Sequence, residues 1–198
     1  MVTKPRSYER QKVRAEKRSP RPLDARRLND LALHYVARFA TSAAKLEDYL
    51  KRKLRERGWD GDGDPGVAAL TTKLVAAGYV DDAAFAKARS GSLLRRGYGE
   101  RRISQALSAA GIGETEREAA RAGAAAQRKA ALTMARKRRF GPFGTAELDR
   151  PAREKQIAAM LRAGHPLDSA RLLITAADQA QAEAWAESED GDEPYEDR

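Results

Sequence analysis

Apolar residues recur one helical turn apart along most of the chain, on stretches that end at a glycine. Leu46, Leu50 and Leu54 lie on one side of such a stretch, and Gly58 follows them. This spacing is typical of an amphipathic helix, and a closing glycine can adopt the left-handed conformation that ends a helix. Alternating runs of β-branched residues, which are typical of strands, do not occur between the turn signals. We therefore predict an all-α fold.

The same pattern repeats along the chain. The Leu-x3-Leu-x3-Gly spacing of residues 50–58 recurs as Ile-x3-Leu-x3-Gly at 103–111 and, less closely, as Ile-x3-Leu-x2-Gly at 157–164. Each copy has a predicted helix before it and another after it, and such small units bury their apolar faces by stacking on neighbours. We predict three tandem three-helix repeats, at residues 28–80, 81–123 and 124–178. The alternative is one irregular helical domain in which the spacing is accidental.

Local signals support these helices. The leading helix of the first repeat carries an apolar stripe made of Leu28, Leu31, Tyr35 and Phe39. Polar side chains that can cap a helix start precede the predicted helices at Thr41-Ser42, Asp81-Asp82 and Asp149. Alanine, leucine, arginine, lysine and glutamate dominate the composition, and these residues lose little side-chain entropy in a helix.

Charge is distributed unevenly along the chain. Residues 1–27 hold ten lysine or arginine residues against three acidic ones, whereas residues 183–198 hold eight acidic residues and one arginine. The two ends therefore cancel, and the stretch between them keeps the net charge of +9. Both ends are polar and contain proline, so we predict a basic disordered tail at 1–27 and an acidic disordered tail at 179–198. A positive folded body suggests a negatively charged partner.

Composition also excludes several classes of protein. There is no cysteine, which excludes disulfides and thiolate metal sites. No run approaches the roughly 18 apolar residues of a membrane span, and the basic N-terminal stretch lacks the apolar core of a secretion signal. We expect a cytoplasmic protein.

We expect neither an enzyme nor a cofactor or metal ion. The Gly/Asp loop that starts at Asp60 alternates acidic residues, but an EF-hand needs glycine at its sixth position and glutamate at its twelfth, where this chain has Pro65 and Thr71. His34 and His165 are the only histidines, and neither has acidic neighbours at metal-binding spacing. Phosphate-binding glycine loops and nucleophile motifs do not occur.

The most distinctive charged segment is RRGYGERR, residues 95–102. It places one arginine pair, Arg95-Arg96, before a Gly-Tyr-Gly break and another, Arg101-Arg102, after it. A helix that starts after the break adds partial positive charge and free N–H donors near these arginines. Four guanidiniums around one helix start suit phosphates or carboxylates, which arginine binds with two parallel hydrogen bonds. For any single arginine, an ordinary solvated helix face is the alternative.

Basic clusters recur in the other two repeats. The middle helix of the first repeat carries Lys51 and Arg52, and the third repeat contains a basic run at 136–139. Repeats that each carry such a patch would present an extended positive surface, which suits an extended anionic partner.

Residues 78–111, GYVDDAAFAKARSGSLLRRGYGERRISQALSAAG, resemble the RecX family of bacterial regulators of the RecA recombinase. The resemblance rests on the Gly-x-hydrophobic-Asp-Asp start, Phe85-Ala86 one turn later, Arg89, and the Arg-Gly-x-Gly and Arg-x-Ile-x3-Leu segments before the closing glycine. It extends more loosely over residues 28–177. The Gly/Asp loop at 58–66 and both tails depart from the family pattern, and Tyr98 stands where a basic residue is common.

The resemblance implies an elongated, curved array of three three-helix repeats without enzymatic activity. It implies a protein that lies in the helical groove of the RecA–DNA filament and restrains ATP hydrolysis, strand exchange and co-protease activity. On this hypothesis we expect a monomer whose partner contacts include Arg89, Arg95, Arg96, Arg101, Arg102, Lys51 and Arg52.

Two other hypotheses stay open from the sequence. One is that the chain is a general binder of single-stranded or double-stranded DNA. Because stacking aromatic residues are not interleaved with its cations, such a protein would be indifferent to base sequence. Its affinity for DNA would fall steeply as the salt concentration rises. In addition, the acidic C-terminal tail would fold back over the basic surface and compete with a polyanion.

Overall fold

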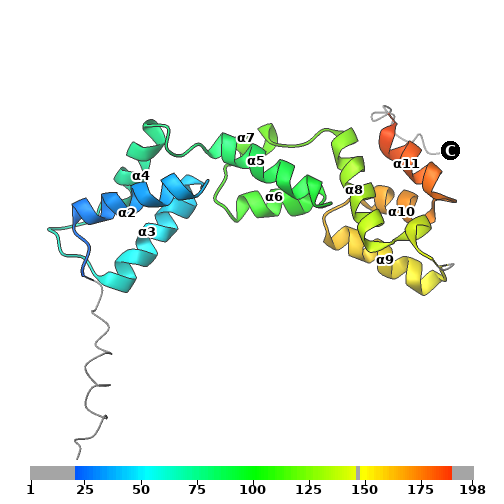
Figure 1. The fold of residues 1–198 in the computed structure, drawn as a ribbon, viewed down its shortest axis with the longest axis horizontal. Coiled ribbons are helices and arrows are strands. Elements are labelled where there is room, and N and C mark those ends of the chain that lie inside the picture. Colours follow the sequence, from blue (N-terminus) through cyan, green and yellow to red (C-terminus); the bar gives the residue numbers. More distant parts are fainter. Residues whose placement is uncertain (1–20, 146–147, 189–198) are drawn as a thin grey trace, which may run out of the picture. The chain divides into compact units, whose positions relative to one another are not determined.

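The computed structural model describes residues 21–145 and 148–188, and its regular elements there are all helices (Figure 1), which confirms the all-α prediction. The chain divides into two compact units between Val80 and Asp81. The elongated, curved arrangement of the repeats stays a prediction.

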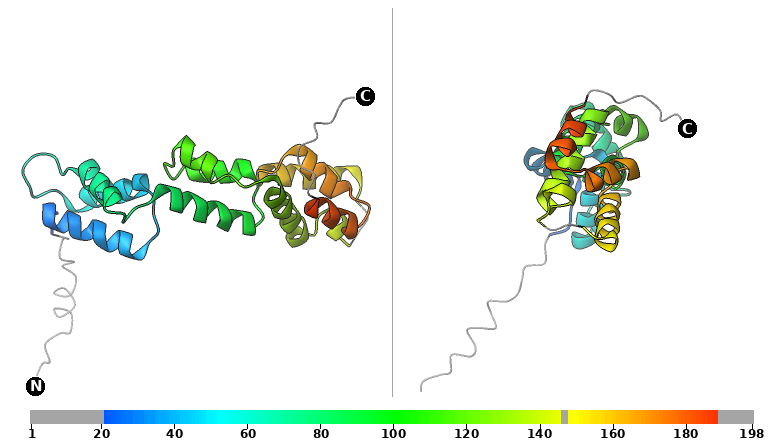
Figure 2. Two further views of the ribbon diagram at one scale, coloured as in Figure 1. Left: turned by 90° about the horizontal axis from the view of Figure 1, so that it is seen from above. Right: turned by 90° about the vertical axis from the view of Figure 1, so that its right-hand side faces the viewer.

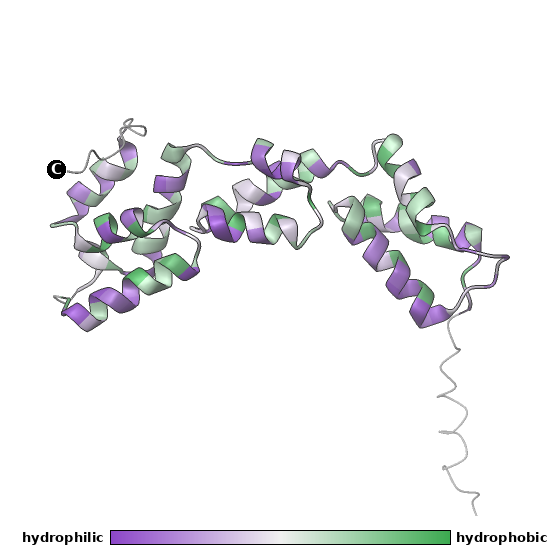
Figure 3. Ribbon diagram, turned by 180° about the vertical axis from the view of Figure 1, so that it is seen from behind, coloured by the Kyte–Doolittle hydropathy of each residue, from purple (hydrophilic) through white to green (hydrophobic). Residues whose placement is uncertain are grey.

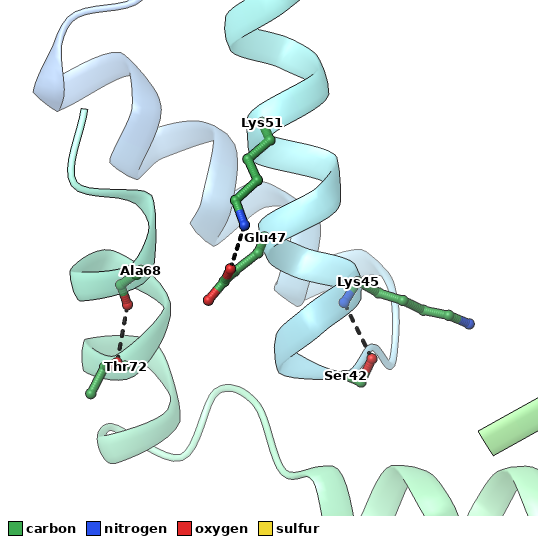
Figure 4. A network of polar contacts seen from close by, with 6 residues as sticks. All are labelled: Ser42, Lys45, Glu47, Lys51, Ala68 and Thr72. Atoms are coloured by element: carbon green, nitrogen blue, oxygen red, sulfur yellow. Dashed lines mark hydrogen bonds and ion pairs between the residues drawn. The ribbon is translucent and has the colours of Figure 1, made fainter. Parts of the chain in front are cut away.

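Unit 1 is a three-helix bundle. Its helices are α2 (Ala25–Arg38), α3 (Ala43–Arg57) and α4 (Val67–Ala76). The predicted cap at Ser42 is present, because its side chain accepts a hydrogen bond from the Lys45 N–H (Figure 4). Gly58 ends α3 with φ of 84°, a backbone conformation that residues other than glycine rarely adopt. Leu28, Leu46 and Leu50 are buried at the centre of the bundle.

Unit 1 begins earlier than predicted. Leu23 is fully buried, and its backbone N–H donates to the Gly58 carbonyl at 3.0 Å while its carbonyl accepts from the Asp60 N–H at 2.9 Å. The prediction of a disordered tail at 1–27 was therefore wrong for residues 21–27, because one apolar residue in a charged stretch anchors the chain to the loop after α3. The rest of that predicted tail, residues 1–20, lies outside the described residues.

The predicted apolar stripe of the first helix is buried only in part. Leu28 is buried and Tyr35 is half-buried, but Phe39 is 53% exposed and follows the last residue of α2 in extended backbone conformation. The helical spacing was correct for the first members of the stripe, and the helix ends before the last one.

Unit 2 contains two groups of helices (Figures 1 and 2). The first group is α5 (Asp82–Arg95), α6 (Glu100–Ser108) and α7 (Glu114–Ala119), and the second is α8 (Ala124–Arg138), η1 (Gly141–Phe143), α9 (Arg150–Arg162), α10 (Leu167–Thr175) and α11 (Gln179–Glu187). Asp81 and Asp149 cap α5 and α9 with their side chains, as predicted. Each group has its own hydrophobic cluster, and Tyr98 packs against both clusters.

Residues 179–188 are not a disordered tail. Residues 179–187 form α11, which contacts α8 and buries Ala182 and Ala186. The Arg136 guanidinium also donates to the Glu183 carboxylate. The predicted boundary was wrong because acidic residues obscured two alanines spaced one turn apart, and the second group consequently has four α-helices instead of three. Residues 189–198 lie outside the described residues.

The two helix groups of unit 2 meet where the start of α6 faces the end of α9. The Gly99 N–H donates to the Ala163 carbonyl at 2.9 Å, and the Arg101 N–H donates to the Gly164 carbonyl at 3.3 Å. Partial positive charge at a helix start thus meets partial negative charge at a helix end. A Cβ atom on Gly99 would lie 2.4 Å from the carbonyl carbon and oxygen of Gly164, so the two backbones touch only because neither carries a side chain. We call this contact the α6–α9 joint.

The surfaces of the helices are amphipathic. Hydrophobic and hydrophilic residues alternate along them in Figure 3, as expected for helices that each bury one face. Within the described ranges, none of the helices combines the length and the hydrophobicity needed to cross a bilayer.

Replacing Gly99 with alanine should destabilise unit 2 by roughly 1–3 kcal/mol, because the added methyl group meets backbone atoms that cannot rotate away. Trp185 packs in unit 2 and Trp59 in unit 1, so denaturant unfolding followed by tryptophan fluorescence in a Trp59→Phe background reports on unit 2.

Gly91→Ala is the matched control. Gly91 lies inside α5, and a Cβ there would approach only the flexible end of the Arg95 side chain, at 3.3 Å. Because alanine favours helix over glycine, this variant should gain about 0.5–1 kcal/mol. Equal effects of the two substitutions would contradict a sterically closed joint.

Candidate functional site

A pocket of about 340 Å³ lies beside the α6–α9 joint. It is bounded by the turn after α5, the start of α6 and the C-terminal ends of α8 and α9. Five cationic side chains line it: Arg96, Arg102, Lys137, Arg138 and Arg162. Among the described residues that form its wall, none is acidic.

A second depression, of about 470 Å³, shares three wall residues with the first. The shared residues are Arg96, Tyr98 and Arg102, and the second depression adds Arg89 from α5. We call the surface formed by the six cations Arg89, Arg96, Arg102, Lys137, Arg138 and Arg162 the basic cleft.

The α5–α6 turn carries the centre of the basic cleft, and contacts from α8 hold it in place. A Cβ atom on Gly97 would lie 3.0–3.2 Å from atoms of Met134, so the turn lies directly against α8. Lys137 donates from Nζ to the carbonyls of Arg95 and Arg96, at 3.3 and 3.4 Å. The Arg96 guanidinium lies 5.4 Å from the centre of the Tyr98 ring, a cation–π contact that orients it.

His165 holds the same turn from the α9 side. His165 is only 4% exposed, and its Nε2 lies 3.0 Å from the Gly97 carbonyl oxygen. The neutral imidazole with its proton on Nε2 satisfies this carbonyl. Burial lowers the pKa of His165, and the hydrogen bond to Gly97 opposes this shift only in part.

The basic cleft concentrates positive charge without compensation. Within residues 21–145 and 148–188, no carboxylate forms an ion pair with any of its six cations. The like charges repel one another, and a bound polyanion would relieve that repulsion while accepting bidentate hydrogen bonds from the guanidiniums. The arrangement therefore suits phosphates or a carboxylate-rich protein surface.

The structure separates the arginines that were predicted to act together. Arg89, Arg96 and Arg102 line the basic cleft. Arg95 is exposed but lines neither depression, and the Arg101 guanidinium donates to the Leu161 carbonyl across the α6–α9 joint. The predicted cluster of four guanidiniums is thus divided, and Arg101 has a structural contact instead of a free face.

The predicted N–H donors at the start of α6 are also engaged. Because the N–H groups of Gly99 and Arg101 bond to the end of α9, they do not face the pocket as anion donors. This part of the sequence interpretation was wrong, since the partner carbonyls lie about sixty residues away in the chain.

Lys51 and Arg52 belong to unit 1, and each has an acidic partner. Figure 4 shows Lys51 reaching back along α3 to Glu47, with Nζ 2.8 Å from the carboxylate, and this hydrogen bond raises the pKa of Lys51. Arg52 lies 3.7 Å from the Glu56 carboxylate. These two cations are therefore partly neutralised, unlike those of the basic cleft.

Three members of the basic cleft were not among the predicted contact residues. Lys137 and Arg138 belong to the basic run of the third repeat, and Arg162 precedes the glycine that closes the third copy of the repeated pattern. The signal that relates them to Arg102 is spatial, because it depends on how α8 and α9 pack against the α5–α6 turn.

The Gly/Asp loop and His34, the other segments considered as sites from the sequence, make local hydrogen bonds. The Asp64 carboxylate accepts from the Gly66 N–H at 2.8 Å and so closes the Gly/Asp loop. His34 is exposed on α2, with Nδ1 2.8 Å from the Asp30 carbonyl. In the part of the chain that the structure describes, no group of three or more histidine and acidic side chains is placed to bind a metal.

Comparisons with known proteins place the chain among RecX proteins. A family model of the second three-helix domain of RecX matches residues 81–120. The regulatory protein RecX of Myxococcus xanthus is 32% identical over 175 residues, covering 84% of this chain and 93% of that protein. The regulatory protein RecX of Agrobacterium fabrum is 29% identical over 157 residues, covering 76% and 83%.

Solved structures show the same fold. The crystal structure of RecX from Lactobacillus salivarius matches with a TM-score of 0.60 at 19% identity, covering 74% of this chain and 91% of that one. Another RecX crystal structure matches with a TM-score of 0.59 at 18% identity, covering 85% and 78%. At these identities the likeness concerns the helical fold alone.

Unit 2 should lose stability as the pH falls below about 6.5, the pKa of an unperturbed histidine. Because the folded-state pKa of His165 is lowered, the unfolded chain binds the proton first, and the contribution of the neutral ring is fully present only above that pH. In His165→Gln, which keeps an N–H donor but does not titrate, this loss should shrink. Unfolding free energies between pH 7.5 and 5.5 measure it.

His34→Gln is the control, since it removes the other histidine, which lies on α2 in unit 1, and the pH profile of unit 2 should match that of the wild-type protein. Burial raises the pKa of Glu100, which acts in the opposite direction, but Glu100 is present in all three proteins and its contribution cancels. If His165→Gln showed the same pH profile as the wild-type protein, the buried His165 ring would not be the cause of the loss of stability at low pH.

Proposed function

The chain belongs to the RecX family of regulatory proteins, and on that premise we propose that it restrains the RecA recombinase by binding the RecA–DNA filament through the basic cleft. The observation that carries this proposal is the convergence of six cations that lack acidic partners among the described residues. The protein would lie in the filament groove as a monomer and act by occupancy, without chemistry of its own. Its effect would be to slow ATP hydrolysis, strand exchange and co-protease activity.

A protein–DNA filament suits the basic cleft because its DNA carries phosphates and its protein component would contribute any acidic side chains on its surface. DNA phosphates and acidic side chains of a protein surface each accept paired hydrogen bonds from arginine. Because the six cations converge on one surface, each adds to the attraction that a bound anion experiences. The cleft therefore supports contact with either component, and binding through it should weaken as salt rises.

Several such contacts would act together on an extended partner. Once one basic surface is engaged, the effective concentration of any other on the same chain rises, so modest contacts combine into stable binding. Lys51 and Arg52 would contribute less than the basic cleft, because a filament must first displace Glu47 and Glu56 from them.

A general nucleic-acid binder is the second candidate, favoured by the same charge. The two functions separate at a salt concentration where bare DNA no longer binds, because counterion release governs nonspecific binding. Continued suppression of RecA ATPase at that salt supports the RecA regulator, whereas simultaneous loss of DNA binding and suppression supports the general binder.

The double variant Arg102→Gln/Arg138→Gln should suppress RecA ATPase on single-stranded DNA on the order of tenfold less effectively than the wild-type protein. Each substitution removes one charge-assisted contact from the basic cleft while keeping a polar side chain of similar length, and about 1.4 kcal/mol of lost binding corresponds to a factor of ten. The measurement is the protein concentration that halves the ATPase rate, with co-sedimentation on preassembled filaments as a direct binding assay.

The control is Lys155→Gln/Arg171→Gln, which removes two exposed positive charges from the same unit outside the basic cleft. It should suppress ATPase as the wild-type protein does, and circular dichroism should show unchanged helix content in both variants. If both double variants lose potency equally, net charge and not the cleft determines binding.

A further inference from the structure

Unit 1 carries three aromatic rings in contact, drawn from two helices. The rings of Tyr35, at the end of α2, and Tyr49, on α3, are stacked with centroids 4.1 Å apart and planes 15° apart. Phe39 extends the series, with its centroid 5.3 Å from that of Tyr35 and its plane tilted by 47°. Folding therefore brings together rings that the sequence separates by up to fourteen positions.

Cations are interleaved with these rings. The Arg38 guanidinium lies 5.8 Å from the centre of the Phe39 ring, and Arg52 and Lys53 lie 5.6 and 5.8 Å from that of Tyr49. The sequence had predicted that aromatic residues are not interleaved with cations, and this prediction was wrong for unit 1. We call the surface formed by Tyr35, Phe39, Tyr49, Arg38, Arg52 and Lys53 the aromatic–cationic surface.

The outer end of this surface is open. Phe39 is 53% exposed and Arg38 is exposed, whereas both tyrosines are half-buried against the core of unit 1. Because the Phe39 side chain is exposed, it contributes little to the core. Within the described part of the chain, no carboxylate forms an ion pair with Arg38. A ring and a charge thus face solvent side by side, on a base of rings fixed by packing.

We propose that the aromatic–cationic surface is a binding site for single-stranded nucleic acid, in which an unpaired base stacks on Phe39 and the adjoining phosphates contact Arg38, Arg52 and Lys53. A ring beside a charge matches a nucleotide, which also joins a flat aromatic base to an anion. An acidic peptide would use the cations without needing the rings. A duplex presents its phosphates but keeps its bases stacked on each other, so it cannot use Phe39.

One acidic residue limits the site at its inner end. The Glu56 carboxylate lies 2.6 Å from Lys53 Nζ and 3.7 Å from the Arg52 guanidinium, so it occupies the position in which a phosphate would bind these cations. Removing its charge should therefore strengthen nucleic-acid binding, an effect opposite to that of removing the ring. The inference does not rest on the proposed function, because its test contains no RecA.

The test uses the full chain and fluorescence anisotropy of three labelled probes of equal length: oligothymidylate, an abasic strand with the same phosphates, and a duplex. The wild-type protein should bind oligothymidylate more tightly than either of the others. Phe39→Ala and Phe39→Leu should both weaken oligothymidylate binding by about fivefold or more, the size expected for one stacked base, and leave the abasic strand unaffected.

Phe39→Leu is the matched control for bulk, because it keeps apolar volume and removes only the ring. Phe39→Trp should retain binding, and the indole fluorescence that it adds to that of Trp59 and Trp185 in the wild-type protein should be quenched by oligothymidylate but not by the abasic strand. Glu56→Gln should tighten binding of both strands severalfold. Circular dichroism confirms folding, which an exposed position such as Phe39 should not disturb.

Equal affinity of the wild-type protein for oligothymidylate and the abasic strand would overturn the proposal, as would equal binding by Phe39→Ala and the wild type. Either result would reduce the surface to an electrostatic contact. Preference for the duplex would overturn it as well. Failure of these tests would leave the proposed regulation of RecA through the basic cleft unaffected, because the cleft variants are measured separately.

Discussion

The organisation of unit 2 depends on one backbone contact, in which the start of α6 meets the end of α9 at Gly99 and Gly164. Two features make it close: N–H groups at the start of α6 donate to Ala163 and Gly164 carbonyls, and neither glycine carries a Cβ that would hold the helices apart. The contact satisfies donors and acceptors that helix ends otherwise leave to solvent. It also explains why an unusually buried histidine, His165, lies next to it, since the Gly97 carbonyl needs a donor once water is excluded.

The basic cleft is a consequence of this joint. Arg102 lies in the first turn of α6 and Arg162 in the last turn of α9, so joining the two helix ends brings these charges to one wall. Lys137 then ties the end of α8 to the carbonyls of Arg95 and Arg96. The packing that builds the core therefore forces cations together, and the repulsion among them is offset by backbone hydrogen bonds and buried apolar surface instead of by carboxylates.

Features encoded within one helical turn were predictable from the sequence, and features that depend on distant segments were not. The caps at Ser42, Asp81 and Asp149 depend on neighbours in the chain, and the structure contains all three. The closing glycines Gly58, Gly111 and Gly164 have positive φ, although Gly58, with ψ of 167°, lies outside the αL region. By contrast, Leu23 is held by the loop after α3, α11 by α8, and Arg101 by the end of α9. Periodicity carries no information on such pairings, so the sequence grouped four arginines around one helix start and gave no sign that Arg101 donates to the Leu161 carbonyl. Their role as partner contacts stays a prediction.

The two units differ in how their cations are balanced, and this difference bears on what each can recognise. In unit 1, Glu47 and Glu56 neutralise the cations of α3 in part, so charge alone gives a weak surface there and the rings of Tyr35, Phe39 and Tyr49 must supply selectivity. In unit 2 the described residues leave the six cations of the basic cleft without carboxylate partners, and charge alone suffices to attract an anion. The basic cleft should therefore discriminate little between ligands that offer only phosphates or carboxylates. A ligand that also offers unpaired bases gains an additional contact in unit 1, because stacking depends on an accessible base and not on charge.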